Sequence, residues 1–164
     1  CVVCTAPSKT FNIAGLQTSN IFIPNPKLRE KFLSVLTLSN PNPKCNILGY
    51  RAAEAAYKNC ASWLDGALKV IEENKNLIVN FMAREFPCVK ISELEGTYLL
   101  WLDLRGLGLN YKELERRNHE QAKLFFDEGY VFGSQGEGFE RWNLACPTRC
   151  IKDALERFKS AYKN

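Results

Sequence analysis

A long amphipathic stretch in the middle of the chain most limits what the sequence can fold into. Between Ser62 and Phe86, apolar side chains recur every three or four residues, which is the spacing of one face of a helix. Ser62 and Asp65 have the spacing of a capping box at the helix start, and Pro87 ends the pattern. The helix would be roughly 35 Å long, which is long enough to bridge two domains.

Chain segments on the N-terminal side of this helix are short and are separated by turns. Cys1–Thr5 is predicted to be a buried strand and Asn20–Ile23 a second, shorter strand. Pro26–Leu38 is predicted to be a helix with its proline at the first position. After a break at Asn40-Pro41-Asn42-Pro43, another helix is expected at about 46–59.

The chain beyond Pro87 changes to a mixture of short strands and helices. Helices are expected at 110–121, where Asn110 is a suitable N-cap, and at 151–162. Strands are expected at 89–91, 98–102, 124–126 and 139–145. This mixture predicts an α+β fold in which a mostly antiparallel sheet has helices packed on one face.

The charged residues are typical of a solvated surface. The 22 Lys and Arg residues against 18 Asp and Glu residues give a formal net charge of +4, and the basic residues are scattered. We therefore expect no nucleic-acid partner. No apolar run has the length that a membrane span requires and no signal peptide is recognisable, so no membrane association is expected.

Seven cysteines are present, an odd number in a chain that shows no sign of secretion. We expect reduced thiols, buried as small apolar residues, in a cytoplasmic protein. A zinc site built from Cys1-x-x-Cys4 and Cys146-x-x-x-Cys150 is the alternative, but only the first pair has the usual ligand spacing. No metal site is therefore expected. His119, the sole histidine, is assigned to the surface because its neighbours are charged.

Lys9 lies in a turn-rich stretch directly after the first predicted strand. Small residues flank it in the segment Ala6-Pro7-Ser8-Lys9-Thr10-Phe11-Asn12-Ile13-Ala14-Gly15-Leu16. An isolated lysine is usually a solvated surface residue. A lysine that is held at a strand end and partly desolvated, however, can lose its proton and attack an aldehyde. Lys9 is therefore a candidate catalytic residue.

The strand expected at 139–145 carries a second candidate. Alternation places Arg141 and Asn143 on one face of this strand, and Trp142 and Leu144 on the other. A planar guanidinium can hold a carboxylate through two parallel hydrogen bonds. Arg141 is therefore a candidate for binding a carboxylate group; the alternative is an arginine on an exposed strand face.

Four blocks of the chain, in the same order, resemble the class I and II aminotransferase-like enzymes that depend on pyridoxal 5′-phosphate (PLP). They are residues 6–16, 59–65, 95–103, and 129–133 with 138–147. The Ser-Lys-Thr-Phe-Asn core, followed by Ala-Gly-Leu, is most similar to the branch of cystathionine β-lyases and other carbon–sulfur lyases. The resemblance implies fold type I, with a remnant of the large PLP-binding domain at 1–40, linking helices at 41–86 and the small C-terminal domain at 87–164.

The same resemblance implies roles for the candidate residues. Lys9 would bind PLP covalently and then remove the Cα proton of a small amino-acid substrate. Arg141 would bind the substrate α-carboxylate, with Asn143 beside it. Ser8 is a weaker candidate for binding the cofactor phosphate.

The reaction that the resemblance favours is a β-elimination. A carbon–sulfur lyase would release a thiol from Cβ of a sulfur amino acid, and pyruvate and ammonia would follow. An aminotransferase is the alternative. Ala6 and Gln17 stand where many aminotransferases carry a phosphate-binding serine and arginine, which favours the lyase branch.

The resemblance also implies a longer parent protein, which agrees with a chain that begins inside an apolar strand. The acidic residue facing the pyridine nitrogen, the aromatic residue stacked on the ring and the first phosphate loop would lie in the missing N-terminal half. The parent is expected to be a cytoplasmic homodimer, and the present chain to be inactive alone. A non-catalytic packing or dimerisation domain is the alternative for this segment.

Overall fold

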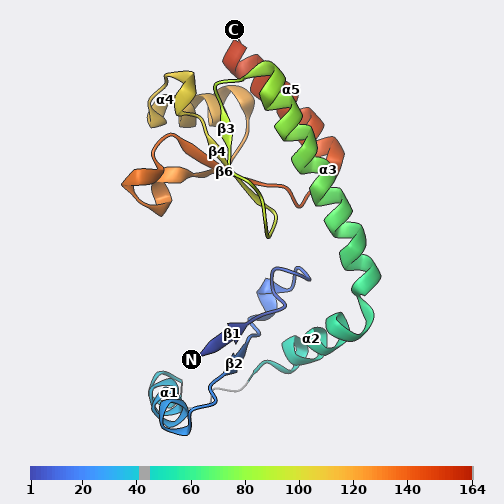
Figure 1. Cartoon of the computed structure of the whole chain (residues 1–164), viewed down its shortest axis with the longest axis vertical. Helices are drawn as coiled ribbons and strands as arrows, with labels where there is room; N and C mark the ends of the chain where they lie inside the picture. The colour runs from blue at the N-terminus through green and yellow to red at the C-terminus, as the bar shows by residue number, and fades with distance from the viewer. Residues whose placement is uncertain (41–44, 164) are drawn as a thin grey trace. The chain divides into compact units, whose positions relative to one another are not determined.

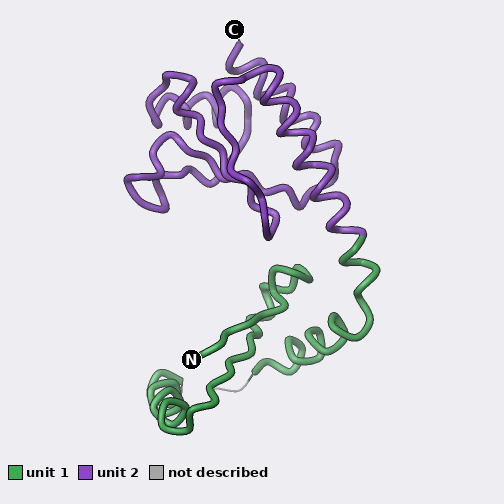
Figure 2. Tube along the Cα trace, viewed as in Figure 1, with its two compact units in different colours: residues 1–65 green, residues 66–164 purple. Residues whose placement is uncertain are grey.

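A computed structural model describes residues 1–40 and 45–163. The backbone divides into two compact units, residues 1–65 and the part that begins at Gly66 (Figure 2). The domain boundaries expected after residues 40 and 86 stay predictions, and most of the predicted Asn40–Pro43 break lies outside the described residues. No helix in the described ranges is long and apolar enough to cross a membrane.

The first unit contains a two-stranded antiparallel ribbon and two helices (Figure 1). β1 (Val3–Thr5) pairs with β2 (Asn20–Phe22). α1 (Pro26–Ser39) and α2 (Ile47–Asn59) follow, close to their predicted positions. The side chain of an asparagine accepts hydrogen bonds from backbone N–H groups at the start of each helix, which explains where each begins; these caps are Asn25 and Asn46.

Two expectations about burial are wrong. Every residue of β1 is exposed, whereas Cys1–Thr5 is predicted to be buried, because no described element of this unit covers the ribbon. None of the seven cysteines is buried: Cys60 and Cys146 are half-buried and the other five are exposed. Residue type therefore predicted a strand at this position, but it did not predict whether the strand or the cysteine side chains are covered by other parts of the protein.

The second unit contains a four-stranded antiparallel sheet. The strands lie in the order β3 (Lys90–Ile91), β4 (Leu99–Asp103), β6 (Phe139–Asn143) and β5 (Asp127–Glu128). β6 therefore pairs along both of its edges, with the five residues of β4 on one side and the two residues of β5 on the other. Glu140 and Arg141 therefore each have a paired residue on both sides within the sheet.

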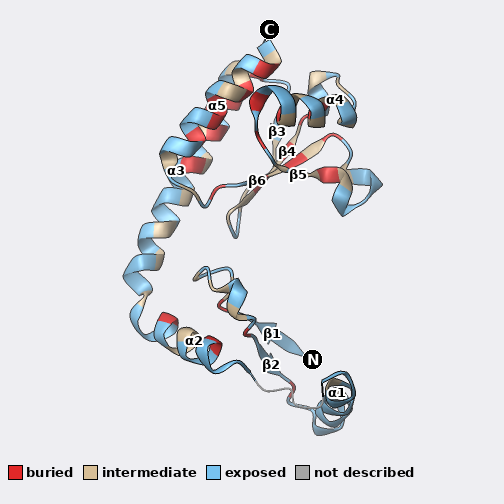
Figure 3. Ribbon diagram, turned by 180° about the vertical axis from the view of Figure 1, so that it is seen from behind, coloured by how far each residue is buried: buried red, intermediate tan, exposed pale blue. Residues whose placement is uncertain are grey.

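Helices cover one face of this sheet and enclose the core. They are α3 (Ala61–Glu85), α4 (Tyr111–Arg116) with the π-helical turn η3 (Arg117–Ala122), and α5 (Thr148–Lys163). α3 begins one residue before the predicted cap, so Ser62 lies inside it and the predicted capping box is wrong. The buried side chains, red in Figure 3, come from both helices and strands; they include Ile78, Met82, Leu100, Leu102, Trp142, Leu144 and Phe158. The α+β prediction is confirmed.

The strand predicted at 124–126 is displaced toward the C-terminus, to β5. Lys123 has a left-handed backbone conformation (φ 54°) that ends η3. Leu124 N then donates to Asn118 O at 2.8 Å, which ties this segment back to the helical turn. Leu124–Phe126 therefore continues from the turn, where Leu124 is hydrogen-bonded, and does not pair with the sheet.

Asn74 joins α3 to the chain that follows β6. Its side chain is completely buried, and Nδ2 donates to the carbonyl oxygens of Leu144 and Cys146, both at 2.9 Å. A buried carbonyl without a donor carries a large desolvation penalty. One amide therefore secures the end of β6 against the helix.

Replacing Asn74 by alanine should lower the free energy of unfolding by about 1–3 kcal/mol, because the Cys146 carbonyl loses its donor, whereas Leu144 O still accepts from Cys146 N. Urea unfolding followed by tryptophan fluorescence measures this change. Asn80→Ala, at an exposed position of the same helix, is the matched control. Equal stability of the two variants would contradict the role of Asn74.

Glu85 connects the end of α3 with α5. Its Oε2 accepts from Lys163 Nζ at 2.7 Å and lies 3.1 Å from Lys159 Nζ, while Oε1 accepts from Arg84 Nε at 2.9 Å. The hydrogen bonds from Lys163, Arg84 and Lys159, in that order of effect, lower the pKa of Glu85 from 4.5 to about 2. The folded protein therefore keeps this carboxylate charged at pH values where the unfolded chain is protonated.

Glu85→Gln should destabilise the protein at pH 7 and have no effect on its stability near pH 2. Because the folded pKa lies below the unfolded one, the stabilisation is complete above pH 4.5 and is lost as the pH falls toward about 2. Thermal unfolding of the variant and wild type across this range tests the prediction. Glu72→Gln, exposed on α3, should show a much smaller pH-dependent difference.

Candidate functional site

Lys9 lies in a hydrogen-bonded turn that begins directly after β1. Phe11 N donates to Pro7 O at 2.9 Å, and Ile13 N donates to Ser8 O at 3.0 Å. Asn12 has a left-handed backbone (φ 54°) that ends the turn, a conformation that asparagine tolerates better than most residues. The turn is therefore closed on both sides of the lysine by backbone contacts.

Aromatic packing fixes this turn within the first unit. The Phe11 ring packs edge-on against Tyr57, with centroids 5.5 Å apart, and roughly parallel to Trp63 at 6.5 Å. Tyr57 belongs to α2, and Trp63 lies in the first turn of α3. The Lys9 backbone is thus anchored two residues away by a side chain in a three-ring cluster.

The functional groups of this turn are free. Lys9 is exposed and Ser8 half-buried. Within the part of the chain that the structure describes, neither the Lys9 amine nor the Ser8 hydroxyl has a hydrogen bond or an ion pair. A rigid backbone therefore presents a primary amine and an adjacent hydroxyl that have no competing partner.

Arg141 lies on β6 and is held by a neighbouring carboxylate. Its Nε and Nη2 atoms donate to Asp127 Oδ2 at 2.9 and 2.8 Å, and Asp127 is its partner across the β5–β6 pair. The guanidinium carbon lies 4.5 Å from the centre of the Phe132 ring, within cation–π range. Asp127 uses the Nε edge of the guanidinium, so the edge formed by Nη1 and Nη2 keeps donors for a second carboxylate.

The surface beside Arg141 is aromatic. Trp101 is its partner across the β4–β6 pair. The Trp101 ring stacks on Phe139 with centroids 5.5 Å apart and meets Phe132 edge-on at 5.6 Å. Asn143 is exposed on the same strand face as predicted, and its Oδ1 accepts from Ala145 N at 2.9 Å. Arg141 therefore stands beside apolar rings that restrict its motion.

The opposite face of β6 carries a buried acid. Glu140 is only 3% exposed, and its Oε1 accepts from Asn118 Nδ2 at 3.2 Å. Burial, followed by the charges of Glu128 and Glu115, raises the Glu140 pKa to about 8. Alternation along the strand places Glu140 on the same inward face as Trp142. Sequence reasoning missed Glu140 because it searched this face for apolar residues only.

Lys9 belongs to the first unit and Arg141 to the second. The functional roles of Lys9, Ser8, Arg141 and Asn143 therefore stay predictions, although the geometry around each is defined. Lys9 and Ser8 adjoin in one turn, and Arg141 and Asn143 share one strand face.

Comparison with known proteins places the chain among PLP enzymes. No family model matches the sequence. Cystathionine β-lyase PatB of Bacillus subtilis is 41% identical over 98% of this chain and 41% of that protein, and protein MalY of Escherichia coli is 35% identical over 87% of this chain and 37% of that protein. An aspartate aminotransferase of Pyrococcus horikoshii is 23% identical over 94% of this chain and 39% of that protein.

Solved structures agree with the sequence relatives. Cystalysin from Treponema denticola, which contains PLP, superposes with a TM-score of 0.93 and 46% identity over 99% of this chain and 41% of that one. The PLP-bound carbon–sulfur lyase from Staphylococcus hominis gives 0.83 and 29% over 98% of this chain and 42% of that one.

The chain has the fold of PLP-dependent enzymes of fold type I. It spans about 41% of the length of the curated relative PatB. Within that class its relatives include cystathionine β-lyases and carbon–sulfur lyases, which agrees with the branch that the lysine motif indicates.

Proposed function

We propose that this chain supplies the cofactor-binding lysine and the carboxylate-binding arginine of a PLP-dependent carbon–sulfur β-lyase. The observation that supports this most strongly is the Lys9 amine, which has no partner among the described residues and is held in a closed turn. The relatives of the chain include lyases of this kind. The substrate class is sulfur amino acids. The overall change is that a β-thio amino acid and water give a thiol, pyruvate and ammonia.

The residues around Lys9 fit PLP. A primary amine without an ion pair can react with the cofactor aldehyde, and the Ser8 hydroxyl beside it is free to donate to a phosphate oxygen. When bound, PLP supplies an electron sink for the pair left on the substrate Cα. Lys9 would also take the Cα proton, because it carries the one amine side chain among residues 6–16.

Arg141 binds and orients the substrate. The free Nη1–Nη2 edge of its guanidinium donates to the α-carboxylate, while Asp127 and Phe132 hold the guanidinium plane in place. Because Arg141 fixes the carboxylate at one end of a small substrate, it also sets the direction of the Cα–H bond. The Asp127 charge weakens the attraction for the carboxylate, so specificity rests on geometry more than on net charge.

The whole protein that we infer is a cytoplasmic homodimer with an N-terminal half that precedes this segment. The exposed apolar side chains of the ribbon support a covering partner: Val3 is 47% and Phe22 56% exposed. An aminotransferase is less well supported because Ala6 and Gln17 replace its phosphate-binding residues.

Incubation of the chain with PLP, followed by borohydride reduction, should attach the cofactor to Lys9 in preference to other lysines. The free amine and the adjacent hydroxyl favour reaction at this position. Peptide mass spectrometry locates the label. Lys9→Ala should lose the label, whereas Lys27→Ala, at an exposed position of α1, should keep it. Equal labelling of many lysines would contradict a specific cofactor-binding site at Lys9.

A chimera that carries this chain in place of the matching 160 residues of the Bacillus subtilis relative tests the arginine. Arg141→Ala should lower kcat/KM for cystathionine by about ten- to a hundredfold, the range expected for losing charge-assisted hydrogen bonds. Arg149→Ala, exposed on α5, should be neutral. Pyruvate should form without an added 2-oxo acid; a requirement for that acceptor would instead indicate an aminotransferase.

A further inference from the structure

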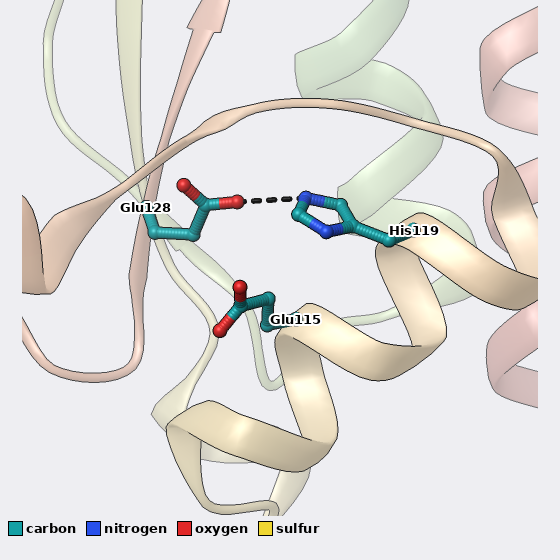
Figure 4. A group of neighbouring side chains, drawn as sticks. All are labelled: Glu115, His119 and Glu128. Carbon is teal, nitrogen blue, oxygen red and sulfur yellow. Dashed lines mark ion pairs between the residues drawn. The ribbon is translucent and has the colours of Figure 1, made fainter.

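Three potential ligand side chains converge on the helix-covered side of the β5–β6 pair. They are Glu115 of α4, His119 of η3 and Glu128 of β5, and one ligand atom from each lies within 4.8 Å of the others. Figure 4 shows the His119 ring and the Glu115 carboxylate turned toward Glu128 from the helical side. The proposed lyase function uses none of the three.

Local structure explains this convergence. Asn110 Oδ1 accepts from Glu113 N at 3.0 Å and starts α4, which carries Glu115. His119 follows four residues later, in the π-helical turn η3. The His119 ring stacks on Phe125 with centroids 4.7 Å apart. Glu128 is fixed by its place in a strand pair. Each side chain is thus positioned by a contact outside the cluster.

The cluster has more negative charge than its one histidine can neutralise. His119 Nε2 lies 2.8 Å from Glu128 Oε1, but this contact lacks hydrogen-bond geometry, and the buried nitrogen has no other partner among the described residues. Glu115 Oε2 accepts from the Tyr130 hydroxyl at 3.3 Å. Two carboxylates and one imidazole therefore share a half-buried position, and one histidine can offset the charge of at most one carboxylate.

Glu140 provides an independent observation. It is the cross-strand partner of Glu128, so it projects from the same face of the strand pair. It is 3% exposed, and its buried Oε2 has no hydrogen-bond partner among the described residues. The charges that act most strongly on it are those of Glu128, Glu115 and Asp127, all acidic. A buried carboxyl oxygen without a partner needs an explanation, and a bound cation, or a water held by one, would supply it.

We propose that Glu115, His119 and Glu128 bind a divalent transition-metal ion, with Glu140 behind them as an acceptor for a metal-bound water. Two carboxylate oxygens and one imidazole nitrogen suit Mn²⁺, Fe²⁺ or Zn²⁺. Ligand atoms at 2.0–2.2 Å from one ion are at most about 4.4 Å apart, so small side-chain rotations bring the present set into range. The ion would fasten the two-residue edge strand β5 to the helix.

Mn²⁺ is the probe of choice because the seven cysteines bind it weakly compared with softer ions. The chain, freed of metal by a chelator, is titrated with Mn²⁺ while electron paramagnetic resonance measures the free ion. One saturable site is expected. His119 is the only histidine, so its ring signals in the NMR spectrum are unique, and bound Mn²⁺ should broaden them before those of other side chains.

Glu128→Gln and Glu115→Gln keep the side-chain shape and should each weaken Mn²⁺ binding by about tenfold or more. Loss of a residue that only hydrogen-bonds to a metal ligand already lowers metal affinity by about this factor. Glu120→Gln removes the same charge from an exposed neighbour and should bind like wild type. Circular dichroism confirms that each variant is folded. Absence of a saturable site, unaffected His119 signals, or an equal loss in Glu120→Gln would overturn the proposal.

Discussion

The alternation of side chains along β6 is the constraint on which the second unit depends. β4 pairs with all five residues of β6, and β5 pairs in addition with Glu140 and Arg141, so these two residues cannot turn to the other face without breaking the pairing on two sides. Arg141 therefore faces Trp101 and Asp127, while Glu140 and Trp142 face the helices. Asn74 of α3 holds the chain just after this strand, by donating to the Leu144 and Cys146 carbonyls. One five-residue strand thus organises the core and both clusters of charged groups.

Sequence patterns predicted those parts of this arrangement that depend on neighbouring residues alone, such as strand faces and helix starts. Alternation identified the face shared by Arg141 and Asn143, and the Asn110 cap located α4. The exposure of Cys1–Thr5 does not follow from the strand pattern, because burial depends on what covers a strand. The strand expected at 124–126 moved because a left-handed Lys123, which no propensity signals, closes the preceding turn.

The candidate site divides into what the sequence could predict and what it could not. Lys9 was identified through its flanking residues, and the structure adds the closed turn and the Phe11 anchor. The contact between Arg141 and Asp127, and the convergence of His119 with Glu128, join residues from separate elements. Neither residue type nor spacing along the chain encodes such pairings, since they arise only when β5 pairs with β6.

β5 consists of two acidic residues that point to opposite sides of the sheet, Asp127 toward Arg141 and Glu128 toward Glu140. A slip of this strand by one residue would exchange the two faces. Asp127 would then leave the guanidinium and Glu128 would leave His119 in the same event. A single-residue insertion or deletion between η3 and β5 would therefore disable two chemically unrelated clusters together, so the length of this connection is as restrictive as the identity of its residues.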